Sequence, residues 1–160
     1  MMKIGITGHS NLTAATEKLV REAIRDALTP YAAKGFTGVT CLAKGADQVF
    51  AQVVLEAGGD LAVVLPSPNY RDRKVKPANL ATFDELLSGA TEIAYLPFEE
   101  PGRDAYMAAS EELVSRSDLM VAVWDGGPAG GHGGTADVVT YAREQGRKVL
   151  VVWPDGAERE

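Results

Sequence analysis

Short continuous apolar runs alternate along the chain with longer segments in which apolar residues recur every three or four positions. The short runs are typical of parallel strands covered on both faces, and the longer spacing is typical of amphipathic helices. We expect strands at residues 3–7, 38–42, 61–65, 92–96, 119–124 and 149–153. We expect one helix after each of the first two strands and further helices around residues 78–87, 103–115 and 135–145.

Six short strands separated by helices, without a hairpin signal, predict a six-stranded parallel sheet with helices on both faces. No linker or shift in composition divides the chain, so we expect one Rossmann-like α/β domain over residues 1–160. Thr13 is the expected N-cap of the first helix, and Pro30 together with Gly35 is expected to mark its end.

The composition is that of a folded globular protein, with 46% hydrophobic and 24% charged residues. The net charge of −6 argues against DNA, RNA or an anionic membrane as a partner, because those surfaces require clustered Lys and Arg. The start MMKIGITGHS lacks the apolar core of a signal peptide, and no apolar run approaches the ~20 residues of a membrane span. We therefore expect a cytoplasmic protein.

The single cysteine, Cys41, lies inside an apolar run and has no intrachain disulfide partner. Together with two distant histidines it supplies too few ligands for a metal site, so none is expected. We expect Cys41 to be a small buried hydrophobic residue.

Three turns that follow expected strands carry candidate chemistry. The first is Gly8-His9-Ser10-Asn11, where glycine permits a close approach and the next helix offers unpaired N–H groups to a phosphate. The side chains of Ser10 and Asn11 could add hydrogen bonds. The alternative is that these residues only cap the helix while His9 points into solvent.

The second turn is Lys44-Gly45-Ala46-Asp47. Asp47 could accept a hydrogen bond from a sugar hydroxyl or a base, or it could stabilise the first helical turn through the helix dipole. Taken alone, Asp47 fits the helix-stabilising role better.

The third turn, from Asp125 to Thr135, contains six glycines in eleven positions. Glycines cost chain entropy, so this density favours an oxyanion site at the start of the next helix over a surface loop. The candidate ligand-binding residues are Asp125, Gly126, Gly127, Gly131, Gly133, Gly134 and Thr135. No lysine follows the glycines, which argues against the triphosphate chemistry of a Walker loop.

A basic segment follows the third strand, with Arg71, Arg73, Lys74 and Lys76 in six positions. Arg71, Arg73 and Lys74 could close over an anionic ligand as a lid, or they could simply keep a long loop solvated. Both interpretations stay open.

The segments GITGHS, CLAKGADQ and SDLMVAVWDGGPAGGHGGTADVV together resemble the SLOG superfamily. This superfamily joins Smf/DprA-type DNA-uptake proteins, LOG-type (lysine-decarboxylase-like) nucleotide hydrolases and molybdenum-cofactor carrier proteins. The resemblance covers nearly the whole chain. It implies a Rossmann-like sheet that binds nucleotides or nucleotide-derived ligands at these turns.

Two departures from the LOG-type pattern bear on activity. The family motif resembles PGGxGTxxE, but Val138 stands here at the glutamate position. The residues 108–111, where the family has an arginine, contain no cation. The remaining acid candidates for catalysis are Asp47, Glu112 and Asp125. The DNA-uptake proteins have additional basic surface that this acidic chain lacks, so DNA binding is not expected.

Three functions follow as hypotheses. The first is binding or sensing of a nucleotide or nucleotide-derived anionic small molecule. The second is hydrolysis of the N-glycosidic bond of a nucleoside monophosphate with non-standard acids, and the third is carriage of a pterin-type molybdenum cofactor. By analogy with related proteins a homodimer or higher homo-oligomer is expected. Its surface could include Tyr106, Met107, Leu113 and Val114, although these four residues fit the core better.

Overall fold

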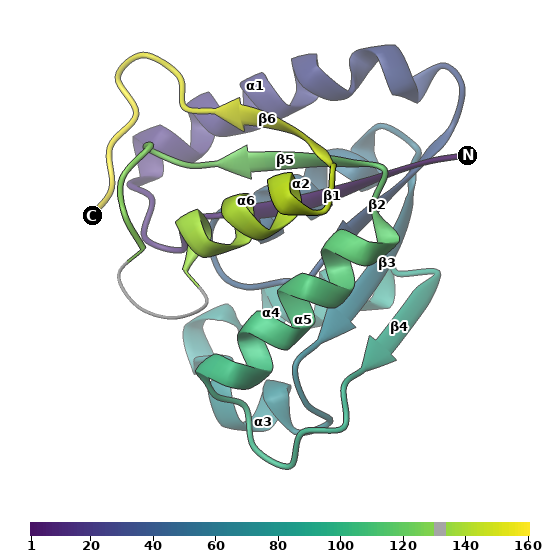
Figure 1. Ribbon diagram of the computed structural model, residues 1–160, viewed down its shortest axis with the longest axis vertical. Coiled ribbons are helices and arrows are strands. Elements are labelled where there is room, and N and C mark those ends of the chain that lie inside the picture. Colours follow the sequence, from purple (N-terminus) through teal and green to yellow (C-terminus); the bar gives the residue numbers. More distant parts are fainter. Residues whose placement is uncertain (130–133) are drawn as a thin grey trace.

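One parallel sheet forms the centre of the molecule, with strand order β4-β3-β2-β1-β5-β6 (Figure 1). A computed structural model gives this arrangement and describes residues 1–129 and 134–160. The strands are β1 (Met2–Gly8), β2 (Phe36–Thr40), β3 (Asp60–Leu65), β4 (Glu92–Tyr95), β5 (Leu119–Val123) and β6 (Lys148–Val152). The expected Rossmann-like sheet of six parallel strands is confirmed.

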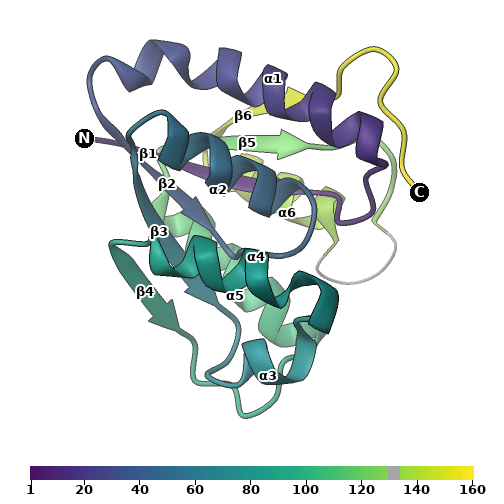
Figure 2. The same cartoon turned by 180° about the vertical axis from the view of Figure 1, so that it is seen from behind.

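Helices cover both faces of the sheet, as expected from the apolar runs. One face carries α1 (Ala14–Ala32), α2 (Ala46–Glu56) and α4 (Pro77–Ser88), which lie in front in Figure 2. The other face carries α5 (Arg103–Arg116) and α6 (Thr135–Glu144), which lie in front in Figure 1. Strands β2, β3 and β5 contribute side chains to both layers, because successive side chains alternate: Val63 belongs to the first core cluster and Val64 to the second.

The order of the strands reverses at β1, which lies between β2 and β5. From β1 the chain moves outward to β4 with helices on one face, then returns to the other side of β1 with helices on the opposite face. Such a reversal leaves a crevice beyond the carboxyl ends of the strands, where ligands bind in open α/β sheets. Here this crevice lies beyond β1 and β5.

Gly8 ends β1 at this reversal and permits an unusually close approach. A Cβ atom at Gly8 would lie 2.5 Å from the Cβ atom of Ala46 and 2.8 Å from that of Val123. Only a glycine therefore lets α2 and β5 pack against the first turn at this distance.

Several element boundaries differ by one or two residues from those expected, whereas the expected start of α1 is confirmed. Thr13 is the N-cap of α1, since its hydroxyl accepts a hydrogen bond from the Thr16 N–H at 3.1 Å. Pro30, however, lies inside the last turn and α1 continues to Ala32, because a proline so near the end removes only one helical hydrogen bond. β2 ends at Thr40, before Leu42, whose backbone is left-handed with φ +56°.

The basic segment after β3 contains a short helix, α3 (Tyr70–Lys74), within a stretch that the sequence presents as irregular. Among the residues that the structure describes, no helix combines the length and the apolar character needed to cross a membrane.

Candidate functional site

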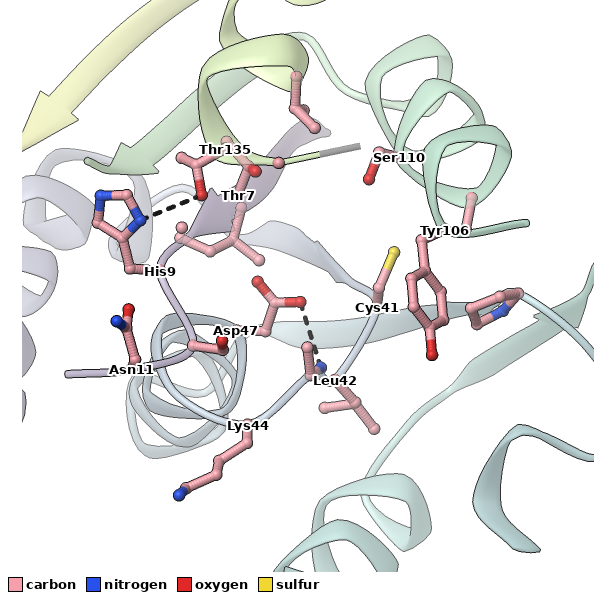
Figure 3. A pocket seen from close by; sticks show the side chains of 18 of the residues that line it. Thr7, His9, Asn11, Cys41, Leu42, Lys44, Asp47, Tyr106, Ser110 and Thr135 are labelled. Atoms are coloured by element: carbon pink, nitrogen blue, oxygen red, sulfur yellow. Dashed lines mark hydrogen bonds between the residues drawn. The ribbon is translucent and has the colours of Figure 1, made fainter. Parts of the chain in front are cut away.

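A cavity of about 730 Å³ lies beyond the carboxyl ends of β1, β2 and β5 (Figure 3). All three turns singled out in the sequence contribute to its wall. Of the expected ligand-binding residues, the lining includes Gly8, His9, Ser10, Asn11, Asp47, Gly134 and Thr135. The structure thus brings together segments that lie more than a hundred positions apart in the chain, at the crevice that the fold predicts.

Other residues expected to bind the ligand do not line the cavity. Gly45, Asp125, Gly126 and Gly127 do not line the cavity, and Gly131 and Gly133 lie outside the described residues. Gly45 has φ +94°, and a Cβ atom there would lie 2.7 Å from the His9 carbonyl oxygen. It serves to bring the second turn against the first, where the Ala46 N–H donates to that same carbonyl at 3.2 Å.

His9 is buried, with 7% of its surface exposed, and does not point into solvent. Its Nε2 atom accepts a hydrogen bond from the Asp125 backbone N–H at 3.1 Å. Nε2 also lies 3.2 Å from Asp125 Oδ1, and Nδ1 lies 3.5 Å from the Thr135 hydroxyl (Figure 3). Burial and then the nearby Arg159 lower the pKa of His9, against the opposing effect of Asp125. The uncharged ring thus links the first turn to the third.

Asn11 is held by the segment 154–160 of the chain. Its Oδ1 atom accepts a hydrogen bond from Arg159 Nε at 3.0 Å, and its carbonyl accepts one from the Glu160 N–H at 2.7 Å. Arg159 Nη1 also lies 3.3 Å from Asp125 Oδ2. These contacts place the Arg159 guanidinium on the cavity wall. Nothing near Arg159 in the sequence indicates this position, because the segment 154–160 lacks any motif.

Asp47 is the second residue of α2 and lies on the cavity wall with 8% of its surface exposed. Its Oδ2 atom accepts a hydrogen bond from the Ala43 N–H at 3.2 Å. α2 has no side-chain cap bond, so Asp47 closes the turn before the helix and does not cap it. Burial raises the pKa of Asp47 to about 7, although the Ala43 N–H favours the charged form.

Among the described residues, no hydrogen-bond donor contacts the Oδ1 atom of Asp47. The turn that positions this carboxyl is strained, because Leu42 has φ +56° and is a bulky residue. Leu42 is held in place by its N–H bond to the Thr40 hydroxyl at 3.0 Å and by Gln48 Nε2, which donates to its carbonyl at 3.1 Å. The structure therefore fixes Asp47 in position while leaving one oxygen free to face the cavity.

An apolar and aromatic wall adjoins Asp47. Tyr106 of α5 and Tyr70 of α3 meet edge to face with ring centroids 6.2 Å apart, and Pro66 and Leu42 lie on the same cavity. Cys41 also points into the cavity (Figure 3). Burial and the nearby Asp47 carboxyl raise the pKa of the Cys41 thiol, which disfavours the thiolate. Sequence analysis did not identify Tyr106 as a cavity residue.

Cations gather around the cavity although the chain is acidic. The basic side chains on its wall are Lys44, Lys74, Lys76 and Arg159, whereas its acidic ones in the described part are Asp47 and Glu160. Arg71 and Arg73, two of the three expected lid residues, do not line it. Arg71 binds Asp84 through two hydrogen bonds of 2.7 Å, and Arg73 pairs with Glu100 at 3.1 Å.

The three candidate catalytic acids do not meet. Glu112 pairs with Arg116 at 3.1 Å and does not line the cavity. Asp125 accepts a hydrogen bond from the Gly127 N–H at 2.9 Å and stays behind the wall. Only Asp47 of these three faces the cavity. No group of three or more metal-ligating side chains occurs in residues 1–129 and 134–160.

The structure also places the four residues considered for an oligomer surface. Leu113 and Val114 are buried in the core, Met107 packs against it, and Tyr106 lines the cavity. From α5, the side chains that reach the cavity are those of Tyr106, Ala109 and Ser110, so this helix supplies no cation there.

No protein-family model matches the sequence, and no curated protein matches it. Solved structures do match. DNA processing protein A (DprA) from Streptococcus pneumoniae is 19% identical with a TM-score of 0.71, over 98% of this chain and 52% of that one. The chain thus spans about half the length of that protein.

DprA from Helicobacter pylori, whose single-stranded DNA binding mode is described, is 16% identical with a TM-score of 0.71, over 99% of this chain and 68% of that one. The molybdenum cofactor binding protein from the phototrophic bacterium Rippkaea orientalis is 20% identical with a TM-score of 0.62, over 96% of this chain and 77% of that one. The chain therefore has the fold of these DprA and molybdenum cofactor binding proteins, which are among the protein classes that the sequence resemblance names.

Proposed function

We propose that the cavity binds a nucleotide or a nucleotide-derived anionic small molecule. The observation that carries this proposal is the convergence of three strand-to-helix turns and four basic side chains on one cavity, in a chain of net charge −6. Its volume of about 730 Å³ is within the usual range for sites of small ligands.

The anionic part of the ligand is proposed to lie at the start of α6. Gly134 is the N-cap and provides no side-chain bond, and the N–H groups of Thr135 and Ala136 have no acceptor within the helix. The helix dipole favours an anion at this end. Arg159 is close enough to this turn to pair with Asp125, so it supplies a full positive charge on the same wall.

The test uses titration calorimetry and thermal shift with nucleoside monophosphates, a pterin and single-stranded DNA. A ligand that binds only the folded state raises the melting temperature by mass action. We expect a monophosphate or pterin to bind, DNA not to bind, and Arg159→Ala to weaken binding about tenfold through loss of a charge-assisted contact. Arg25→Ala is the matched control, since Arg25 also pairs with an exposed carboxylate but lies off the cavity.

A substitution that obstructs the start of α6 provides a second variant. Gly134→Asp introduces a like charge where the ligand anion is proposed to lie, and we expect it to abolish binding. The proposal fails if no member of the panel raises the melting temperature, or if Gly134→Asp and Arg159→Ala both bind as tightly as the unaltered protein.

A second candidate function is hydrolysis of a nucleoside monophosphate. The observation in its favour is Asp47, a cavity carboxyl whose pKa of about 7 suits proton transfer near neutral pH. A carboxyl group close to the anomeric carbon could protonate the leaving base or stabilise an oxocarbenium-like transition state. Release of free base that Asp47→Asn abolishes would support this function, and no release at high enzyme concentration would exclude it.

A molybdenum-bearing pterin is a further ligand that the same cavity could accept. Solved structures with this fold include a molybdenum cofactor binding protein, and the phosphate site proposed here suits any phosphate-bearing ligand. Metal content and absorbance of the purified protein test this ligand directly.

A further inference from the structure

We propose that Asp47 recognises the ring of the bound ligand, and that this ring presents two adjacent N–H donors, as the 2-amino-oxo edge of guanine and of pterin does. The proposal rests on the binding function proposed above and goes further by naming the class of ring. The proposal is based on the position of the Asp47 carboxyl, which is fixed on the cavity wall with its Oδ1 atom free, beside the aromatic ring of Tyr106.

The carboxyl is held as a fixed acceptor. Its Oδ2 atom accepts the Ala43 N–H at 3.2 Å, and the left-handed Leu42 sets the course of the turn. Its Oδ1 atom has no hydrogen-bond donor in the described part of the chain. Only 8% of the surface of Asp47 is exposed. An ionised carboxylate only accepts hydrogen bonds, so the ligand must bring the donors.

The groups around Asp47 do not supply a compensating cation. Cys41 and Tyr70 lie near enough to interact with it electrostatically, and both are uncharged at neutral pH because burial raises the pKa of each. Tyr106 contributes a second phenol from α5. The Lys44 side chain points away from the Asp47 carboxyl (Figure 3).

The remaining ionisable groups on the cavity wall are His9, Lys74, Lys76, Arg159 and Glu160. None of them forms a hydrogen bond or ion pair with Asp47 in the described part of the chain. A neutral donor edge therefore satisfies Asp47 without requiring a charged partner from the protein.

Ring chemistry separates the candidate ligands. A 2-amino-oxo ring carries an N–H and an amino group side by side, which match a carboxylate through two parallel hydrogen bonds, as a guanidinium does. One bond would go to the free Oδ1 atom and the other to the second acceptor site of Oδ2, which also accepts the Ala43 N–H. Adenine carries a single amino donor beside a ring nitrogen that is an acceptor, and this acceptor would face the carboxylate. Tyr106, Leu42 and Pro66 offer apolar surface to the flat ring on the same wall.

Binding of such an edge is coupled to a proton. Burial raises the pKa of Asp47 to about 7, so the carboxyl of the free protein is partly protonated near neutral pH. Donors from the ligand favour the ionised form, and binding therefore releases this proton. The affinity is expected to rise as the pH increases through 7, and to change little above about pH 8.

The experiment measures affinity by titration calorimetry at about pH 6 and about pH 8 for GMP, IMP, AMP and pterin-6-carboxylate. IMP keeps the ring N–H but lacks the amino group. We expect GMP or the pterin to bind about tenfold more tightly than AMP, with IMP between them, and more tightly at the higher pH. Guanine and pterin share the 2-amino-oxo edge, so the tighter binding of GMP or of the pterin shows which of the two rings the cavity prefers.

Asp47→Asn is expected to lose about tenfold in affinity for the preferred ligand and to remove the pH dependence. The asparagine Oδ1 can still accept the Ala43 N–H, so the turn is preserved. Glu112→Gln is the matched control, because it makes the same carboxyl-to-amide change at a residue off the cavity. The pH dependence of the unaltered protein provides an independent measurement that needs no variant.

The outcomes separate the two proposals. If no ligand of the panel binds, the binding function itself fails. If AMP and GMP bind equally and Asp47→Asn leaves both affinity and pH dependence unchanged, the role of Asp47 is overturned while the binding function stands. If Asp47→Asn abolishes base release but keeps the affinity, Asp47 acts in catalysis and the recognition role is also overturned.

Discussion

The Nε2 atom of His9 accepts a hydrogen bond from the backbone N–H of Asp125 at 3.1 Å, across 116 positions of sequence. The opposite ring nitrogen lies 3.5 Å from the Thr135 hydroxyl at the start of α6. One imidazole therefore spans both ends of the third turn and ties it to the first. Trp153 packs its ring against His9 at a centroid distance of 5.6 Å and closes the other side.

His9→Ala is expected to destabilise the protein, because it leaves the Asp125 N–H without its acceptor. The loss should be about 1–3 kcal/mol at pH 7.5, measured by chemical denaturation. Burial lowers the pKa of His9, so the folded state binds this proton less tightly than the unfolded state. The contribution of the neutral His9 ring to the free energy of unfolding is thus fully present above about pH 6.5, and it declines as the pH falls below that value.

The difference between the unaltered protein and His9→Ala should accordingly shrink on going from about pH 7.5 to about pH 5.5. A difference that grows toward acidic pH would mean that the ring is charged in the folded state. That result would contradict the hydrogen-bonding pattern described for Nε2.

Asp47→Asn is expected to stabilise the folded protein at alkaline pH. The pKa of Asp47 in the folded protein, about 7, lies above the ordinary value of 3.8. Protonation of the carboxyl therefore contributes most to the free energy of unfolding below pH 3.8, and this contribution is lost as the pH rises through 7. Each pKa unit corresponds to about 1.4 kcal/mol. Relative to Asp47→Asn, the unaltered protein should lose on the order of 2 kcal/mol between about pH 5 and about pH 8.

Denaturation curves at the two pH values, with Glu112→Gln as control, check this expectation. Parallel pH profiles for the unaltered protein and Asp47→Asn would show that the carboxyl is solvated in the absence of ligand. The comparison needs no ligand and is independent of the function proposed for the cavity.

Gly8→Ala is expected to cost about 1–3 kcal/mol, because its Cβ atom would overlap those of Ala46 and Val123. The control is Gly102→Ala at the N-cap of α5, where a Cβ atom meets nothing within 4 Å. We expect less than about 1 kcal/mol there. Equal losses in the two variants, measured by denaturation, would contradict the close approach at the reversal of the strand order.

The basic segment after β3 offers a comparison among neighbouring cations. Lys74 and Lys76 line the cavity, whereas Arg71 and Arg73 are paired with Asp84 and Glu100. Lys74→Ala and Lys76→Ala are each expected to weaken binding of an anionic ligand about two- to fivefold at low salt. Arg71→Ala should leave the affinity unchanged, and a loss in Arg71→Ala equal to that in Lys74→Ala would indicate a lid that includes the arginine.

The sequence by itself determined the layers of the fold and the edge of the sheet at which the candidate site lies. The apolar run 61–65 indicated a strand covered on both faces, and Val63 and Val64 do belong to different cores. Gly8 ends β1 and Gly134 directly precedes α6, so their positions could be assigned from neighbouring residues alone. Such signals are local, because they depend on the spacing of apolar residues along one element and on the conformational freedom of single glycines.

Only the tertiary structure decided what each side chain of the site does. Nothing beside His9 in the sequence indicates that its ring bonds the Asp125 N–H, and nothing beside Arg159 indicates the cavity. Asp47 fitted a helix-stabilising role until the structure showed it buried, bonded to Ala43 and next to Cys41. Burial and partners depend on contacts between residues distant in sequence, and these contacts set the charge state and the orientation of the groups that face a ligand.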